Sequence, residues 1–382
     1  MKFKVSSILS LLLAILVFSS NPPWFIWGFN YYLIFSVILL ILGLIFFGKK
    51  KCDKNLFYAL PIVLLSIIYF ILIKSLGEFR FSTVLLFLIY LSLFFIDEED
   101  KKNGFNIFSN FLFVLILISL PLWLIHNFVF TLPYSFPLAY DQSLGKGEGL
   151  IFWNYIFFIQ PELDYFRFYS VFDEPGVLGL LCTIVLFVNN YNFSEKKNIV
   201  ILLGGIFTFS LAFYIFTFIG YIFHVLMQRK LKSLLFAFIL FISLTPFLIT
   251  IESFRLSIVD RFNNFKQSLL ERNGIQLDQF YDVFIYTPNF YYGESLDFFS
   301  KNSYLKEGQS YKFFFIEYGI IGFLLMIFLY LFLIDKRKVN IYVIFLLIIF
   351  ILSFIQRPFM FTPWQIALFS MALPYLYKEG KK

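Results

Sequence analysis

The stretch RFYSVFDEPGVLGLL, residues 167–181, places an arginine, two adjacent acids and a Pro-Gly pair directly against an apolar run. A guanidinium such as that of Arg167 forms bidentate, permanently charged hydrogen bonds to phosphate oxygens. A carboxylate in a partly dry cleft can deprotonate a hydroxyl, a role open to Asp173 and Glu174. The same stretch also suits the start of a helix, where acids favour the N-terminal dipole and proline occupies the first turn.

Three further residues could act on the same kind of substrate. Arg255 and Arg261 lie six residues apart in ESFRLSIVDRFNNF, close to two helical turns, so a short helix would bring them to roughly one face. Their alternative role is pairing with lipid headgroups or with a local acid such as Asp260. Glu317 is the one acid expected inside an apolar segment, about two turns from its outer end. Its alternative role is an ion pair that joins two elements.

Composition determines the class of protein that positions these groups. Of 382 residues, 60% are hydrophobic, 23% aromatic and only 14% charged, which is outside the range of soluble globular proteins. Apolar stretches near the roughly 20 residues of a spanning helix recur along the chain. Examples are VSSILSLLLAILVFSS, STVLLFLIYLSLFFI and GIIGFLLMIFLYLFLI. The sequence therefore predicts an all-α integral membrane protein, one polytopic domain over residues 1–382.

The distribution of basic residues predicts the topology, because lysine and arginine are kept on the cytoplasmic side. Of the 31 basic residues, 19 lie in clusters such as GKKKCDK, QRKLKS and DKRK. The apolar run over residues 198–227 fits their alternation only as two short helices that meet near Thr208–Ser210. We therefore expect about twelve membrane segments, of which the seventh and eighth are short, with both termini cytoplasmic.

This topology puts two long loops, residues 131–173 and 251–309, on the outer face, where they carry more than half of the 24 acids. Long loops without secondary structure tend to be functional. The cytoplasmic loops are short and basic and hold no Gly-rich nucleotide motif, which argues against a nucleotide substrate. Cytoplasmic anchoring to anionic lipid accounts for the net charge of +7 without a nucleic-acid partner. The two cysteines support neither a disulfide nor a metal site, and we expect no cofactor.

Three motifs resemble those of O-antigen polymerases. RFYSVFDEPGVLGLL resembles the Arg-rich f-x-E-P-G start of their sixth helix, and GGIFTFSLAFYIFTFIG resembles their tfS helix pair. SYKFFFIEYGIIGFLL resembles the syl-x-x-l-x-E-x-G-i-i-G helix that follows their large outer loop. The resemblance covers residues 167–324, whereas the first five helices match only in number and apolar character. The chain thus resembles a Wzy-type polymerase of oligosaccharide repeat units, within the O-antigen ligase and polymerase superfamily.

The resemblance implies a metal-independent glycosyltransferase of the bacterial inner (plasma) membrane. Its substrates would be undecaprenyl-diphosphate-linked oligosaccharides on the outer face, and its product O-antigen or a capsular or exopolysaccharide. Arg167, Arg261 and, as a weaker candidate, Arg255 would then bind the diphosphate. Glu174 or Asp173 would deprotonate the acceptor hydroxyl, with Glu317 as a further catalytic candidate. Membrane lipid is an expected partner, and a chain-length regulator is left open.

The sequence also departs from the family pattern. Gly308 and Gln309 stand where the ligases commonly carry histidine and asparagine, which disfavours a ligase. Ser210 is followed by Leu211 rather than by the arginine frequent in the family, so no anion-binding role can be carried over to that position. A flippase for the same lipid-linked repeat unit remains the alternative outside the enzymes. A transferase of the oligosaccharyl or mannosyl type is disfavoured because SSNPPWFIWG, the first outer loop, contains no acid.

Overall fold

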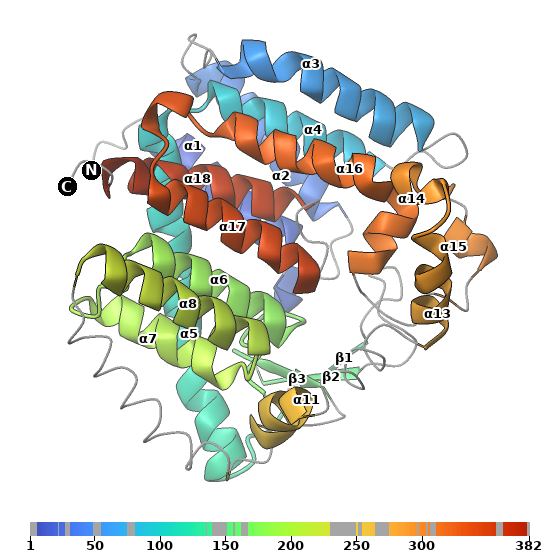
Figure 1. Ribbon diagram of the computed structural model, residues 1–382. Helices are drawn as coiled ribbons and strands as arrows, with labels where there is room; N and C mark the ends of the chain where they lie inside the picture. Colours follow the sequence, from blue (N-terminus) through green and yellow to red (C-terminus); the bar gives the residue numbers. More distant parts are fainter. Residues whose placement is uncertain are drawn as a thin grey trace. The chain divides into compact units, whose positions relative to one another are not determined.

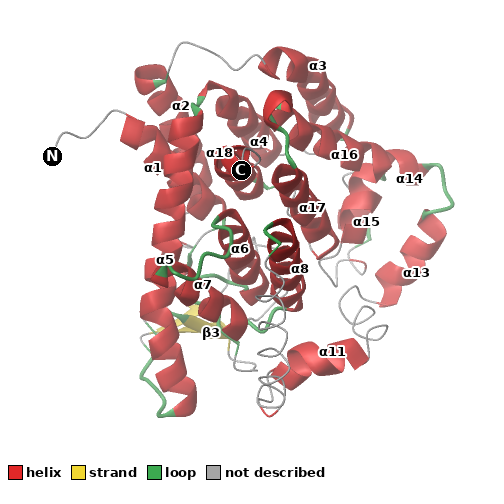
Figure 2. Cartoon of the chain, turned by 60° about the vertical axis from the view of Figure 1, so that its left-hand side comes forward, coloured by secondary structure: helices red, strands yellow, loops and turns green. Residues whose placement is uncertain are grey.

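The computed structural model describes residues 6–21, 23–26, 31–48, 55–74, 81–134, 136–139, 151–155, 157–161, 167–229, 250, 254–263, 275–295, 298–302, 305, 311–356 and 362–379. Most of these residues are helical, and helices dominate Figure 2. The chain divides into two compact units. Helix α5 (Glu98–Phe128) contributes to both, because residues up to Phe108 belong to the first unit and those from Ser109 to the second.

The first unit comprises residues 1–21, 29–108 and 269–382. Within it α1 packs against α2 and α18, and α16 packs along α3 (Figure 1). Its core contains large side chains such as Trp364 and Tyr330, and the Tyr90 hydroxyl donates a hydrogen bond of 2.8 Å to the Leu329 carbonyl. The helices are α1 (Ser6–Ser20), α2 (Tyr32–Phe47), α3 (Asn55–Ile67) with its π-helical continuation η2 (Ile68–Ile73), α4 (Phe81–Ser92), η3 (Leu93–Phe95), α13 (Ile275–Phe284), α14 (Asn289–Tyr292), α15 (Phe298–Lys301), α16 (Tyr311–Leu333), η7 (Lys336–Lys338), α17 (Ile341–Gln356) and α18 (Pro363–Glu379).

The second unit comprises residues 22–28 and 109–268. Its central helix, α6, is apolar on every side, and all of its residues are buried, as expected for a helix enclosed by other elements. Both α7 and α8 pack against it. The remaining elements are η1 (Trp24–Ile26), β1 (Phe136–Ala139), β2 (Ile151–Asn154), β3 (Ile159–Pro161), α6 (Pro175–Val188), α7 (Lys196–Phe207), α8 (Leu211–Met227), the π-helical η5 (Arg255–Val259) and α11 (Asp260–Asn263).

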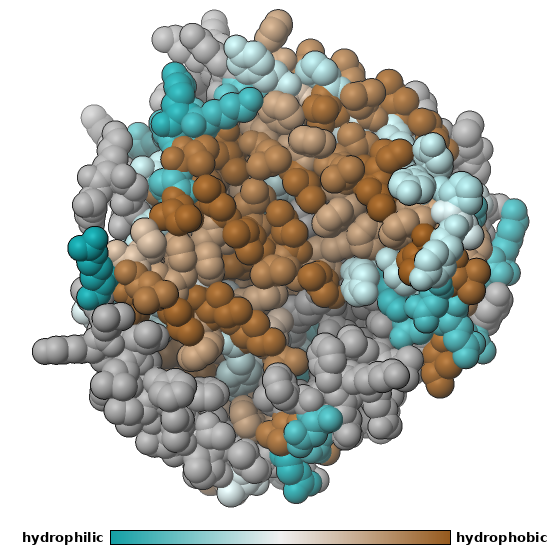
Figure 3. Space-filling model, viewed as in Figure 1, coloured by the Kyte–Doolittle hydropathy of each residue, from teal (hydrophilic) through white to brown (hydrophobic). Residues whose placement is uncertain are grey.

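Two of the described helices, α5 and α16, are long and apolar enough to cross a membrane by length and composition. The shorter apolar helices α2, α3, α8 and α17 leave many large apolar side chains exposed, for example Phe57, Phe46 and Ile344. Figure 3 shows hydrophobic side chains over much of one face. Exposed apolar side chains in such numbers are typical of surfaces that contact lipid or protein. The two long apolar helices thus indicate a membrane protein.

The interruption predicted inside residues 198–227 is present in the structure. Helix α7 ends at Phe207 and α8 begins at Leu211, so the chain breaks at Thr208–Ser210 as the charge alternation required. The helices are short, with 12 residues in α7 and 17 in α8. The apolar segment expected to follow QRKLKS lies almost entirely outside the described residues.

The predicted outer loops contain more secondary structure than we expected. In the loop over residues 131–173, an antiparallel sheet of order β1-β2-β3 pairs Phe136 with Asn154 and Phe152 with Pro161. The sequence analysis expected no regular structure there, because each strand has only three or four residues and shows no clear alternation. In the loop over residues 251–309, helices α13, α14 and α15 form what we call the helical cap.

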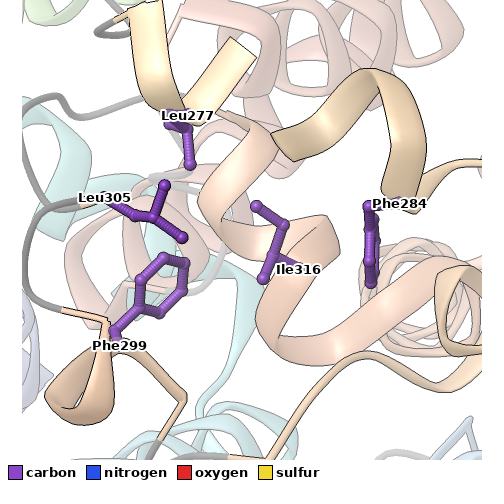
Figure 4. Packing of buried hydrophobic residues seen from close by; sticks show 5 residues of the cluster. All are labelled: Leu277, Phe284, Phe299, Leu305 and Ile316. Carbon is purple, nitrogen blue, oxygen red and sulfur yellow. The ribbon is translucent and has the colours of Figure 1, made fainter. Parts of the chain in front are cut away.

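The helical cap has its own apolar core (Figure 4). Leu277, Phe284, Phe299 and Leu305 pack around Ile316 from the start of α16. The core is bordered by partly buried aromatic rings, among them Phe280 and Phe298 with ring centroids 5.1 Å apart. Burial of each such side chain contributes roughly 1.5–3 kcal/mol. The cap is therefore held to α16 by packing.

A buried ion pair also joins the cap to α16. The Lys312 ammonium lies 2.7 Å from Oδ1 of Asp278, and the two side chains are 11% and 13% exposed. The same ammonium lies over the Tyr281 ring, 4.8 Å from its centroid. Removing one member of such a pair leaves an uncompensated charge in a poorly solvated place.

We predict that Lys312→Met lowers the free energy of unfolding by about 3–5 kcal/mol, because Asp278 loses its cation while it remains buried. The thermal midpoint of the purified full-length protein in detergent measures this loss. The double variant Lys312→Met with Asp278→Asn removes both charges and should recover most of it. Equal midpoints for the wild type and Lys312→Met would contradict the prediction.

Candidate functional site

The segment from Arg167 to Phe172 follows an irregular path held by backbone hydrogen bonds. The Phe168 amide donates to the Phe207 carbonyl at 2.9 Å, and the Ile159 amide donates to the Ser170 carbonyl at 2.9 Å. Ser170 has a φ of 53°, which is rare for a residue with a side chain, and its hydroxyl lies 2.8 Å from that of Ser119. This stretch of RFYSVF is thus fixed between β3 and the end of α7.

Arg167 joins the first motif to the second. Its Nε donates to the Thr208 carbonyl at 3.0 Å, and its Nη2 donates to the Phe209 carbonyl at 3.3 Å. Both acceptors follow the end of α7, where a helix leaves carbonyls unsatisfied and carries a partial negative charge. The partners expected for Arg167 were a diphosphate, lipid headgroups or local acids, whereas the structure shows backbone carbonyls of the helix break. Arg167 therefore caps α7.

The backbone at the break between α7 and α8 is strained, and the Thr208 side chain supplies hydrogen bonds to it. Phe209 has a φ of 46°, in the left-handed region that a residue with a side chain rarely adopts. The Thr208 hydroxyl donates to the Gly205 carbonyl at 2.6 Å and accepts from the Ser210 amide at 3.2 Å. Strain of this kind persists where surrounding structure enforces it, and it is concentrated at functional sites.

Two helix N-termini lie beside this break. Helix α6 begins at Pro175 with Glu174 as its N-cap, and α8 begins at Leu211. A Cβ added to Gly179 of α6 would lie 3.1 Å from Cβ of Ser210, so the two starts are adjacent. The Thr183 and Thr217 hydroxyls, 3.0 Å apart, extend the contact along the parallel pair. The two N-termini and the guanidinium bring positive charge to this region, and Asp173 and Glu174 bring negative charge to the start of α6.

Asp173 and Glu174 are both half-buried at the start of α6. The helix-start interpretation of DEPG is confirmed, because Glu174 is the extended N-cap residue and Pro175 the first helical residue. Both acids therefore lie at the same end of α6 as the helix break that Arg167 caps.

Arg255 lies next to the same break. Phe254, the residue before it, contacts the rings of Phe209 and Tyr214 at centroid distances of 5.9 and 5.8 Å. Arg255 itself is exposed. Arg261 belongs to α11, and its side chain lies outside the described part of the chain. Residues 255–259 are π-helical rather than α-helical, and the shared face of the two arginines stays a prediction.

Glu317 belongs to the first unit, whereas the other predicted site residues belong to the second. It is half-buried in α16, six residues after Tyr311, as the sequence predicts. Its charge acts on Lys74, which directly follows η2. The cation expected to pair with Glu317 was an arginine of the outer loops, whereas in the structure the charge of Glu317 acts on a lysine.

Lys74 is the functional candidate that sequence reasoning missed. It is only 7% exposed, and its ammonium donates to the Glu294 carbonyl at 3.0 Å. Burial lowers the pKa of Lys74 to about 8, although the charges of Glu294 and Glu317 act to raise it. In the sequence, Lys74 is one of two basic residues in the short segment KSLGEFR, which the predicted topology places on the outer face. The only signal was its position directly after an apolar segment.

The histidines take structural roles in the described part of the chain. Nδ1 of His126 accepts a hydrogen bond of 3.0 Å from the Leu132 amide, and its ring lies 4.3 Å from that of Tyr155. His224 is buried in α8, with its ring 5.9 Å from that of Tyr191. The ring contacts of both residues contribute to packing, and His126 also accepts a hydrogen bond.

We predict that Arg167→Gln lowers the thermal midpoint of the purified protein, because each charge-assisted hydrogen bond to a carbonyl is worth about 1.5–3 kcal/mol. Arg167→Lys should restore only part of the loss, since an ammonium does not reproduce the planar fork. Arg229→Gln, at an exposed arginine that follows the other end of α8, is the matched control. A wild-type midpoint for Arg167→Gln would show that the cap contributes nothing.

The lowered pKa of Lys74 predicts a pH dependence of stability. The unfolded chain holds this proton up to pH about 10.4, whereas the folded chain releases it near pH 8. Burial therefore destabilises the folded state below pH 8, and this penalty is lost as the pH rises toward 10. Between pH 8 and about 10, the unfolding free energy of the wild type should therefore rise relative to that of Lys74→Met. A difference independent of pH would show that the pKa of Lys74 is not lowered.

The chain matches no family model, no curated protein and no solved structure. A functional interpretation therefore rests on the residues and on their geometry. Arg167, the strained break and the paired helix starts form one candidate site, with Arg255 beside it. Glu317 and Lys74 form a second group of candidate residues in the other unit.

Proposed function

We propose that the protein polymerises undecaprenyl-diphosphate-linked oligosaccharide repeat units into O-antigen or a capsular or exopolysaccharide. It would act on the outer face of the bacterial inner membrane, with about twelve spanning segments and both termini in the cytoplasm. The observation that carries the proposal is the meeting of Arg167 with the α7–α8 break beside the starts of α6 and α8. A guanidinium and two helix N-termini suit the diphosphate of a lipid-linked glycan.

In the proposed reaction, a hydroxyl of the acceptor glycan attacks the anomeric carbon of the donor glycan. The new glycosidic C–O bond forms as the bond from that carbon to the diphosphate oxygen breaks, and undecaprenyl diphosphate leaves with the electron pair. Asp173 or Glu174 takes the proton of the attacking hydroxyl. Arg255 and Arg261 stabilise the departing diphosphate through permanent positive charge, without a metal ion or other cofactor.

The structure modifies the role proposed for Arg167. Two of its donors already bond to backbone carbonyls of the break. Arg167 thus supports the site by fixing the break, and its charge adds to the local positive potential. Arg255, which is exposed beside Phe254, is the better placed of the described arginines to contact a diphosphate directly.

The deciding experiment compares surface polysaccharide from a deletion strain and its complemented parent on a gel. A polymerase predicts loss of the long ladder while a single repeat unit remains on its acceptor. Loss of every species, with undecaprenyl-linked repeats accumulating inside the cell, would instead identify a flippase or an earlier step. A normal ladder in the deletion strain would exclude the proposed function.

We predict that Arg255→Gln in the complemented strain lowers the yield of long polymer about 10-fold or more, which corresponds to a loss of at least ~1.4 kcal/mol of transition-state stabilisation. Arg229→Gln controls for removal of an exposed arginine. Protein levels by immunoblot should match for both variants. A wild-type ladder for Arg255→Gln would exclude Arg255 from the site.

A further inference from the structure

Three departures from regular helix meet around Glu317. Helix α16 is interrupted at Gly319, which has φ 61° and ψ −172°. The chain after α14 turns at Gly293, which has a φ of 74°. Helix α3 ends in the π-helical η2, directly before Lys74. A Cβ on Gly319 would clash with the Tyr291 carbonyl oxygen, and one on Gly293 would clash with that of Glu317. The glycines allow the two backbones to touch.

Hydrogen bonds connect these three interruptions. The Glu294 amide donates to the Ile316 carbonyl at 2.5 Å. The Tyr69 hydroxyl lies 2.7 Å from the carbonyls of both Tyr292 and Tyr318, so its one proton is shared between α14 and α16. Lys74 completes the set by donating to the Glu294 carbonyl. The residues on either side of Glu317 are therefore both bonded to neighbouring elements.

The charges at this junction are arranged around Lys74. Lys74 is buried, and the carboxylates whose charges act on it, Glu294 and Glu317, come from the cap and from α16. A buried ammonium is costly unless it is hydrogen-bonded and paired with opposite charge. The junction supplies the hydrogen bond, because the Glu294 carbonyl accepts from Lys74, and the charges of Glu294 and Glu317 favour the ammonium.

We propose that Lys74 is a positioning residue that holds Glu317 and the turn at Gly293–Glu294 in one arrangement, so that Glu317 is presented to the glycan substrate. This inference rests on the proposed polymerase function for what Glu317 does. It assigns to Lys74 the task of fixing Glu317, and it assigns to the π-helical end of α3 the task of delivering the lysine. π-Helical turns are frequent at functional sites.

Charge on Lys74 is required by this role, so the pH dependence has a defined sign. Below pH 8 Lys74 is protonated and the junction is complete, whereas above it the ammonium is lost. Three variants of the full-length protein in the deletion strain separate the possibilities. Lys74→Met removes the charge, and Lys74→Arg makes it permanent. Lys196→Met, at the exposed first residue of α7, is the control.

Two readouts test the proposal. Hydrogen exchange on the purified protein should be at least about 10-fold faster at the Glu294 amide in Lys74→Met than in Lys196→Met, since the Lys74 bond no longer holds that turn closed. Polymer formed in membrane vesicles at pH 6–9.5 should decline above pH 8 for the wild type, and the decline should move to higher pH for Lys74→Arg. Lys74→Met should form little polymer at any pH at matched protein levels.

The outcomes separate this inference from the proposed function. Wild-type exchange in Lys74→Met would overturn the proposal, as would a Lys74→Arg profile that declines at the wild-type pH. Faster exchange with undiminished polymer would also overturn it, because Lys74 would then hold the turn without serving Glu317. A normal ladder in the deletion strain would exclude the polymerase itself while leaving the exchange measurement on Lys74 valid.

Discussion

Backbone hydrogen bonding inside an apolar structure is the constraint on which the rest of this protein depends. Wherever a helix is interrupted in such surroundings, its amides and carbonyls need partners, because unsatisfied groups cost several kcal/mol each. The chain interrupts its helices between Phe207 and Leu211 and again at Gly319. At each interruption, chemistry-bearing side chains supply the missing bonds, Arg167 at the first and Tyr69 at the second.

This constraint explains why polar residues precede the apolar helix α6 in the segment that begins at Arg167. Arg167 neutralises the carbonyl end of α7, while Glu174 and Pro175 begin α6 beside the start of α8. One short stretch therefore satisfies a helix end and starts a buried helix. The same geometry concentrates positive potential where an anionic headgroup could bind. The α7–α8 break is both the structure that Arg167 supports and part of the proposed diphosphate site. A substitution that disturbs the break is therefore expected to affect both stability and the proposed activity.

The sequence anticipated the local elements far better than it anticipated their partners. Hydrophobic runs and charge alternation located the helices and the break at Thr208–Ser210, because both signals are local in sequence. The small sheet and the cap core were missed. Their strands are only three or four residues long, and Ile316 packs with Leu277 and Phe284 over a large sequence separation. The π-helical turn over Arg255–Val259 was also not anticipated, because π-helical geometry leaves no clear sequence signature.

By itself, the sequence determined that this is a mainly helical, apolar chain, that Arg167, Asp173 and Glu174 stand at the start of an apolar segment, and that Glu317 lies inside another. Apolar periodicity and helix-start chemistry depend on near neighbours, so they can be read from a single chain. Only the tertiary structure decided which groups meet. In the structure, Arg167 donates hydrogen bonds to the carbonyls of Thr208 and Phe209, and Lys74 lies where the charge of Glu317 acts on it. These contacts join residues far apart in the chain, and their partners are selected by packing, which no local pattern specifies.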